Sequence, residues 1–244
     1  MKVKIFEDYD QLSGAAAEEI LETIKNKPNA VLCLAAGDTP KGTYQYLVQR
    51  MEAEGVDGSA LRFVGLDEWV GIPPHNPGSC QNFLNENLFY PLKIKPNQCY
   101  LFDALNTNIQ SECKKMDHAM DELGGIDFML VGIGMNGHIG FNEPGVSPDL
   151  QSHVIALDEM TRAVGQKYFH QETALSQGIT LGLKNLLESG KVLLVANGER
   201  KAPIVRLALE GPISNEVPAS LIRKHPKGLA FLDQKAAQLI SGFP

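Results

Sequence analysis

The chain has 244 residues and a formal net charge of −7 at pH 7, with 43% hydrophobic and 21% charged residues. This composition supports a substantial core and excludes an intrinsically disordered chain, which has few apolar residues and a high net charge. The acidic balance argues against nucleic acid and anionic membranes as partners, because both favour basic protein surfaces.

The N-terminal segment turns acidic at Glu7 and Asp8 before an apolar run develops, so it does not resemble a secretory signal. No apolar stretch approaches the roughly 18 residues of a membrane span. We therefore expect a cytoplasmic protein. The cysteines have no CxxC spacing, which predicts neither a disulfide framework nor a zinc site; they are Cys33, Cys80, Cys99 and Cys113.

Short runs of Val, Ile, Leu and Phe alternate with helical periodicity, which is the pattern of βα units in a mostly parallel sheet. Several runs are apolar on both faces, as strands covered on both sides are. We predict a doubly wound, Rossmann-like α/β fold and, because no linker or repeat interrupts the pattern, a single domain over residues 1–244. The predicted strands are Met1–Phe6, Ala30–Ala35, Leu61–Leu66, Asp127–Val131, Lys191–Ala196 and Gly228–Leu232.

Apolar residues at i, i+3, i+4 and i+7 predict amphipathic helices between these strands. Thr39 is predicted to cap the second helix, with Pro40 at its first position. Two segments, Gly71–Gly78 and Asn142–His153, show no regular hydrophobic periodicity, which predicts surface loops near a site. The apolar stripes are Ala17, Ile20, Leu21 and Ile24; Tyr44, Leu47, Val48 and Met51; and Cys113, Met116, Met120 and Leu123.

Ligands of doubly wound sheets bind beyond the carboxyl ends of the strands, so the segments that follow the strands are candidate sites. The first is Ala36–Pro40, a tight turn that opens a helix. Its free N–H groups and the positive helix end suit a phosphate. Ordinary turn and capping chemistry explains the same residues and is modestly favoured, and the carboxylate of Asp38 opposes an anion.

The second segment begins with Asp67 and Glu68, directly after Leu61–Leu66. A carboxylate beside apolar groups has a raised pKa, which suits it to abstract a proton near neutral pH. A helix-capping or solvated acidic pair explains the same two residues equally well. We expect Trp69, the next residue, to serve packing and not chemistry.

The third segment, Gly132–Pro144, has four glycines in its first nine positions, which allow close approach of the backbone to a ligand. His138 and Glu143 in this segment predict an oriented acid/base pair. No third ligand lies at zinc spacing, so we predict no metal. The Gly-x-Gly-x-x-Gly pattern leads into Phe141–Pro144 and not into an amphipathic helix, so we expect no nicotinamide cofactor.

The motifs Ala-Gly-x-Thr-Pro, Leu-Asp-Glu-Trp-Val-Gly and Gly-x-Gly-x-Asn-Gly-His-Ile-Gly-Phe-Asn-Glu-Pro together resemble the glucosamine-6-phosphate deaminase/isomerase family over essentially the full length. The related 6-phosphogluconolactonases look similar up to Gly-His and then diverge, so Phe141–Pro144 favours the amino-sugar branch. The resemblance implies conversion of glucosamine 6-phosphate to fructose 6-phosphate and ammonia, without a cofactor.

The resemblance also implies residue roles. His138 opens the pyranose ring, while Glu143 and Asn136 orient its imidazole. Asp67 moves the C2 proton to C1. The residues that hold the phosphate are Ala36, Gly37, Asp38, Thr39, Arg162 and Lys201.

The chain also departs from the family pattern. Asn136 stands where some members have Asp, which leaves His138 with one fewer anionic neighbour, and Asp38 stands where Gly or Ser is common. Trp69 replaces the commoner Tyr, which also resembles galactosamine-6-phosphate isomerases and leaves the substrate epimer open. Gln151–Leu157 lacks the basic allosteric residues of larger members, so we expect no activation by N-acetylglucosamine 6-phosphate.

Two other functions compete with the deaminase. A lactonase acting on a 6-phosphosugar acid would use His138 for hydrolysis and would not need Asp67 as a carbon base. A non-catalytic sugar-phosphate sensor would keep the pocket, but the presence of Asp67, His138 and Glu143 together argues against it. We expect a small-molecule sugar phosphate as the partner of a monomer or small homo-oligomer.

Overall fold

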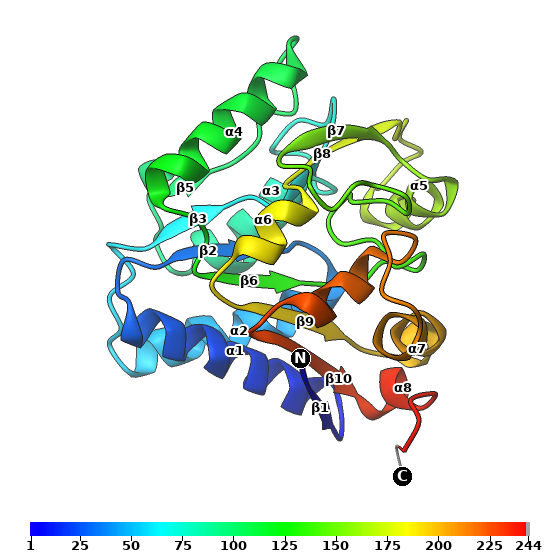
Figure 1. Ribbon diagram of the computed structural model, residues 1–244. Helices are drawn as coiled ribbons and strands as arrows, with labels where there is room; N and C mark the ends of the chain where they lie inside the picture. The colour runs from blue at the N-terminus through cyan, green and yellow to red at the C-terminus, as the bar shows by residue number, and fades with distance from the viewer. Residues whose placement is uncertain (243–244) are drawn as a thin grey trace.

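The computed structural model describes residues 1–242, in which strands and helices alternate along the chain (Figure 1). The strands are β1 (Lys2–Phe6), β2 (Val31–Leu34), β3 (Arg62–Val64), β4 (Asp67–Trp69), β5 (Cys99–Tyr100), β6 (Phe128–Val131), β7 (His153–Ala156), β8 (Gln177–Thr180), β9 (Val192–Ala196) and β10 (Gly228–Asp233). The α-helices are α1 (Tyr9–Asn26), α2 (Asp38–Ala53), α3 (Cys80–Leu84), α4 (Ile109–Leu123), α5 (Glu159–Gly165), α6 (Leu183–Glu188), α7 (Ala202–Glu210) and α8 (Gln234–Ala237). The 3-10 segments are η2 (Pro96–Gln98), η3 (Gln166–Tyr168), η4 (Glu199–Lys201) and η5 (Pro218–Lys224), and η1 (Asn85–Phe89) is a π-helix.

The main sheet has the strand order β1-β10-β9-β6-β2-β3-β5, and every neighbouring pair in it is parallel. All six strands predicted from the sequence lie in this sheet, which confirms the doubly wound, mostly parallel fold. The two-residue strand β5 was not predicted, because so short a run carries no periodicity.

Helices cover both faces of the sheet because alternate strand residues point to opposite sides. On β2, Leu32 and Leu34 belong to one core cluster, with side chains of α1 and α2. Val31 and Cys33 belong to the other cluster, with side chains of α4, α6 and α7. The three predicted helical stripes lie in α1, α2 and α4, as expected, with Val48 and Leu123 partly buried and the rest buried.

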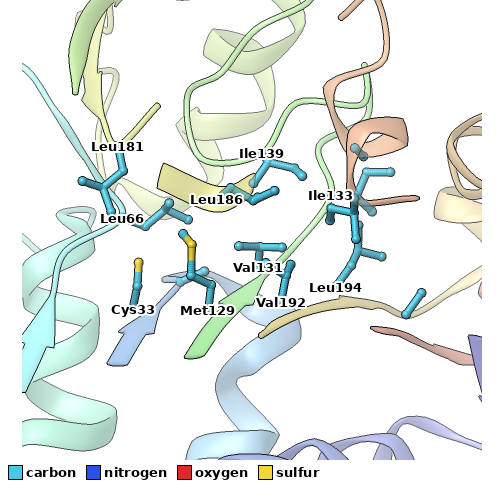
Figure 2. Packing of buried hydrophobic residues seen from close by; sticks show 14 of the residues in the cluster. Cys33, Leu66, Met129, Val131, Ile133, Ile139, Leu181, Leu186, Val192 and Leu194 are labelled. Atoms are coloured by element: carbon cyan, nitrogen blue, oxygen red, sulfur yellow. The ribbon is translucent and has the colours of Figure 1, made fainter. Parts of the chain in front are cut away.

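The core also fixes the glycine-rich segment that follows β6 (Figure 2). Met129 and Val131 of β6 belong to the same buried cluster as Ile133 and Ile139, which flank the turn. Ile133 and Ile139 are 5% and 1% exposed, and each buried isoleucine contributes roughly 1.5–3 kcal/mol. These two anchors hold the intervening residues, including His138, at the carboxyl end of β6.

A second sheet, which the sequence did not predict, is antiparallel and has the order β4-β8-β7. Asp67 of β4 pairs with Thr180 of β8, so the candidate segment directly after Leu61–Leu66 is itself a strand. Its pairing partner lies more than a hundred residues away along the chain, which local sequence patterns do not report.

The start of α2 differs from the prediction. The helix begins at Asp38, with Gly37 as its N-cap at φ +116°, a backbone conformation that glycine adopts without strain. Pro40 is therefore the third helical residue. Thr39 does not cap the helix, because its hydroxyl donates to Asn197 Oδ1 at 2.7 Å.

The two predicted loops have irregular structure, except that β7 already begins at His153. Pro77 and Gly78 at the end of the first loop line the pocket described below, whereas Asn142–His153 does not reach it. Among residues 1–242, no helix combines the length and the hydropathy that a bilayer span requires.

Candidate active site

One pocket brings together all three segments that the sequence indicated. They follow β2, β3 and β6, whose carboxyl ends lie side by side in the sheet. Residues of α3, α5, η3 and η4 complete the walls. The polar side chains that line it are Asp38, Thr39, Asp67, Ser79, Asn136, His138, Thr161, Lys167, Tyr168 and Lys201, and among the other lining residues are Ala36, Gly37, Trp69, Cys80, Gly134 and Phe141.

Asp67 presents a carboxylate of altered acidity to this pocket. Burial, with the nearby charge of Glu68, raises its pKa to about 7, while a hydrogen bond from Cys80 opposes the shift. A carboxylate with this pKa is partly ionised at neutral pH and is therefore suited to take up and return a proton.

Glu68 has a different task. It is 3% exposed and accepts hydrogen bonds from Ser79 Oγ and from the backbone N–H groups of Trp69, Cys80 and Gln81, at 2.6 to 3.0 Å. It therefore fixes the beginning of α3, and with it the position of Cys80. The two sequence interpretations of the acidic pair thus apply to different residues, with Asp67 facing the pocket and Glu68 holding a helix.

His138 lies in a hydrogen-bonded network. Its Nδ1 is 3.0 Å from Thr161 Oγ1 and 3.3 Å from Glu143 Oε2, and Asn136 Nδ2 donates to the same Glu143 oxygen at 2.8 Å. Burial opposes the charge on Glu143, but the hydrogen bonds from His138, Thr161 and Asn136 lower its pKa overall. With Nδ1 engaged by these oxygens, Nε2 is the nitrogen left for proton transfer.

Gly134 makes room for this imidazole. A Cβ atom at position 134 would lie 2.3 Å from His138 Nε2, which no side chain tolerates. The segment then continues into a turn closed by an Ile139–Asn142 bridge, and not into a helix, as predicted. The glycine pattern therefore serves the histidine.

The predicted phosphate turn, Ala36–Thr39, lies at the start of α2 and lines the pocket. Lys201, at the start of α7, also lines it, and its ammonium group donates to the carbonyl of Ile133. Burial, with the charges of Lys167 and Arg200, lowers the pKa of Lys201 to about 8. A helix end and a lysine therefore converge on one side of the pocket.

Arg162, also predicted to hold the phosphate, is exposed and is not among the residues that line the pocket, so its role stays a prediction. On α5 and η3 the residues that line the pocket are Met160, Thr161, Val164, Gly165, Lys167 and Tyr168. Lys167 is thus the cationic side chain that this part of the chain presents to the pocket. Helical phase does not separate the two cations, because both lie about 100° or more from Thr161, so the sequence carried no signal for Lys167.

Trp69 packs, as expected. Its ring centroid lies 4.5 Å from that of Phe141 and 6.1 Å from that of Phe169, and the ring is 5% exposed. A Cβ atom on Gly165 would come within 2.6 Å of the indole, so α5 rests directly on Trp69. This aromatic cluster supports the wall of the pocket.

Within residues 1–242, no three His, Cys, Asp or Glu side chains gather as metal ligands would. The four cysteines are unpaired with one another in this part of the chain. The absence of a metal or cofactor from the reaction stays a prediction.

Comparison with known proteins identifies the family. A sequence model described as glucosamine-6-phosphate isomerases/6-phosphogluconolactonase matches residues 7–231. The chain belongs to this family. Glucosamine-6-phosphate deaminase 1 of Bacillus subtilis (strain 168) is 38% identical over 240 residues, covering 98% of this chain and 99% of the relative. The glucosamine-6-phosphate deaminase of Clostridium tetani (strain Massachusetts / E88) is 40% identical, covering 98% and 100%.

Solved structures of the family agree. A monomeric glucosamine-6-phosphate deaminase superposes with a TM-score of 0.95 at 38% identity, covering 98% of this chain and 100% of that one. The 6-phosphogluconolactonase from Trypanosoma brucei has a TM-score of 0.76 at 20% identity, covering 97% of each chain. The similarity to the lactonase shows the shared fold alone. The similarity to the deaminase extends to 38% sequence identity over nearly the whole chain.

Proposed function

We propose that the chain is a glucosamine-6-phosphate deaminase, which converts glucosamine 6-phosphate and water to fructose 6-phosphate and ammonia. One observation carries the proposal: a carboxylate with a pKa of about 7, Asp67, shares a pocket with His138, whose Nδ1 lies 3.3 Å from Glu143 Oε2 outside the pocket lining. Full-length relatives that are 38–40% identical and named as this deaminase support it.

Ring opening is the first step. The proton on the anomeric hydroxyl must reach the ring oxygen, and His138 is the group suited to carry it through Nε2. Glu143, Thr161 and Asn136 hold the other side of this network, so the imidazole keeps one orientation during the transfer. The product of the step is the open-chain amino aldose.

Isomerisation and deamination follow. Asp67 removes the proton from C2, and the electrons of this C–H bond form the C1–C2 double bond of an enolamine. The electrons of the C1 carbonyl move to O1, which takes up a proton that the substrate's ammonium group gives up. Asp67 then delivers a proton to C1, which leaves an iminium at C2. Water adds to C2 and ammonia departs, so the net reaction hydrolyses the C2–N bond and moves the carbonyl from C1 to C2. The overall consumption of water is why the enzyme counts as a hydrolase as well as an isomerase.

The phosphate serves as a remote handle. We assign it to the backbone turn Gly37–Thr39 and to Lys201 and Lys167, which line the same pocket. Binding energy at this end aligns C1 and C2 with Asp67, and such alignment accounts for a large share of the rate enhancement in many enzymes.

An assay of ammonia and ketose phosphate tests the proposal. With glucosamine 6-phosphate we expect both products in equal amounts. A lactonase would instead hydrolyse 6-phosphogluconolactone without releasing ammonia. Faster turnover of galactosamine 6-phosphate would identify the other epimer as substrate. Binding of several amino-sugar phosphates without any turnover would indicate a sensor and would reject the enzyme.

We further propose a monomer acting in the cytoplasm. The closely superposing deaminase is described as monomeric, and phosphorylated sugars are retained inside cells. A molecular mass near 26.6 kDa by light scattering would agree with the monomer, whereas a multiple of it would contradict it.

A further inference from the structure

Asp38 and Lys167 form an ion pair that joins two walls of the pocket. Asp38 Oδ2 lies 2.6 Å from Lys167 Nζ. Asp38 is the first residue of α2, whereas Lys167 belongs to η3, and both side chains line the pocket. They are 71% and 50% exposed, so the pair lies where the pocket meets solvent.

In this pair, Asp38 binds one of the two lysine ammonium groups that line the pocket. Among the described residues that line it, Lys167 and Lys201 carry such groups, and Lys201 is already bound to the carbonyl of Ile133. Burial opposes the charge on Lys167, but the hydrogen bond to Asp38 and the adjacent charges raise its pKa overall. Lys167 is therefore charged and paired with Asp38.

A phosphate bound at the start of α2 would lie beside the carboxylate of Asp38. Two anions compete for one ammonium group, and at short separation they also repel each other. Breaking an exposed ion pair weakens binding by a factor of about 1.5 to 5. Repulsion at the pocket adds a further factor of up to about 10, and salt reduces it.

We propose that Asp38 is an internal competitor for the phosphate group. Its carboxylate pairs with Lys167, and the phosphate of the substrate competes with it for this ammonium group. Asp38 thereby sets the affinity of the pocket for phosphate esters. The inference rests on the proposed function in one respect, namely that the phosphate binds at the start of α2.

The test measures inorganic phosphate binding by calorimetry. Asp38→Asn removes the charge and keeps the shape, and Asp38→Ser is a second variant. We expect the dissociation constant of phosphate to fall between about 3-fold and 30-fold in both. It should also rise more steeply with salt, because phosphate then binds a free Lys167 and does not exchange with another anion.

Two further variants of the chain serve as controls. Glu159→Gln removes one exposed negative charge at the start of α5, outside the pocket lining, and should change the dissociation constant less than about 2-fold. In a Lys167→Met background, Asp38→Asn should have a smaller effect than in the native chain, because the pair no longer exists.

Unchanged or weaker phosphate binding in both Asp38 variants would overturn the proposal. An equal effect of Asp38→Asn with and without Lys167 would do so too, as would a lack of phosphate binding by every protein. Ammonia release from glucosamine 6-phosphate is measured separately on the native chain. Failure there, with the phosphate shift intact, would reject the proposed deaminase and leave the role of Asp38 standing.

Discussion

The buried position of Asp67 suits it to proton transfer but lowers the stability of the folded chain. Its burial raises the pKa to about 7, so above that pH the folded chain holds an ionised carboxylate in an unfavourable place. The stabilising contribution of the protonated group is complete below the unfolded pKa near 4 and is lost as pH rises through about 7. The altered acidity that suits proton transfer therefore lowers stability at the pH of catalysis.

Asp67→Asn should separate these two effects. We expect the variant to bind the substrate phosphate as before and to lose at least about 100-fold in kcat, because amide cannot shuttle the proton. At pH 8 its melting temperature should be higher than that of the native chain, since the buried charge is gone. Steady-state kinetics and thermal unfolding at pH 8 measure both. Full activity of Asp67→Asn would reject Asp67 as the base.

The pH profile tests the environment of the same carboxylate. Activity, as kcat/KM, should rise with pH through about 7 as Asp67 ionises. Cys80→Ala removes a hydrogen bond that lowers the pKa of Asp67, so the midpoint should move to higher pH. Cys99→Ala, a matched change outside the pocket lining, should leave the profile unchanged. A midpoint that stays in place in Cys80→Ala contradicts the contact.

His138→Gln addresses ring opening. Glutamine keeps a polar group but cannot carry the proton, so turnover of the closed-ring substrate should fall about 100-fold or more. An open-chain substrate analogue bypasses this step and should lose much less. The comparison of the two kcat/KM ratios is the measurement. Equal losses on both substrates would remove the ring-opening role from His138.

The beginning of α3 depends on one buried carboxylate. Glu68→Gln keeps the size of the side chain but replaces one acceptor oxygen with an N–H group that faces the donors of Ser79 and Gln81. We expect a loss of about 1–3 kcal/mol in the free energy of unfolding. Glu86→Gln, an exposed change in η1, is the control and should lie within about 0.5 kcal/mol of the native chain. Similar free energies of unfolding for Glu68→Gln and Glu86→Gln would show that the hydrogen bonds of Glu68 contribute little to stability.

The sequence predicted the elements that local periodicity specifies. Both-face apolar runs located six of the parallel strands, and i, i+3, i+4 stripes located α1, α2 and α4. It missed the β4-β8-β7 sheet, because these strands have no continuous apolar run on both faces, and partners distant in the chain specify them. Local sequence patterns therefore predicted the main sheet, at whose edge the pocket lies, but not the second sheet, which positions Asp67.

The candidate site shows the same division. Asp67 directly follows one predicted strand, and Asn136 and His138 lie in the glycine-rich segment after another, so the ends of those strands placed these three residues in one pocket. Glu143 does not line the pocket but lies 3.3 Å from His138 Nδ1. Arg162 does not line the pocket, and the motif that suggested it does not report which side chains of α5 and η3 face the pocket. The roles of these residues remain predictions, because their placement alone does not establish the chemistry.

At the scale of the whole molecule, we propose that the chain forms a single domain. β1 near the start pairs in parallel with β10 near residue 229, and Leu12 of α1 shares a core cluster with Phe231 of β10. Unfolding should therefore be one cooperative transition. Fluorescence of Trp69, the sole tryptophan, and far-UV circular dichroism should report the same denaturant midpoint. An earlier midpoint for Trp69 would indicate a separate unit around β4.

Lys201 gives the pocket a group that exchanges protons with solvent near pH 8. With a pKa of about 8, part of its population is uncharged in mildly alkaline solution. A phosphate dianion favours the ammonium form, so each binding event draws a fraction of a proton from the buffer. The net charge of the complex then changes by less than the two charges that the ligand brings. The heat of binding consequently includes a share contributed by the buffer itself.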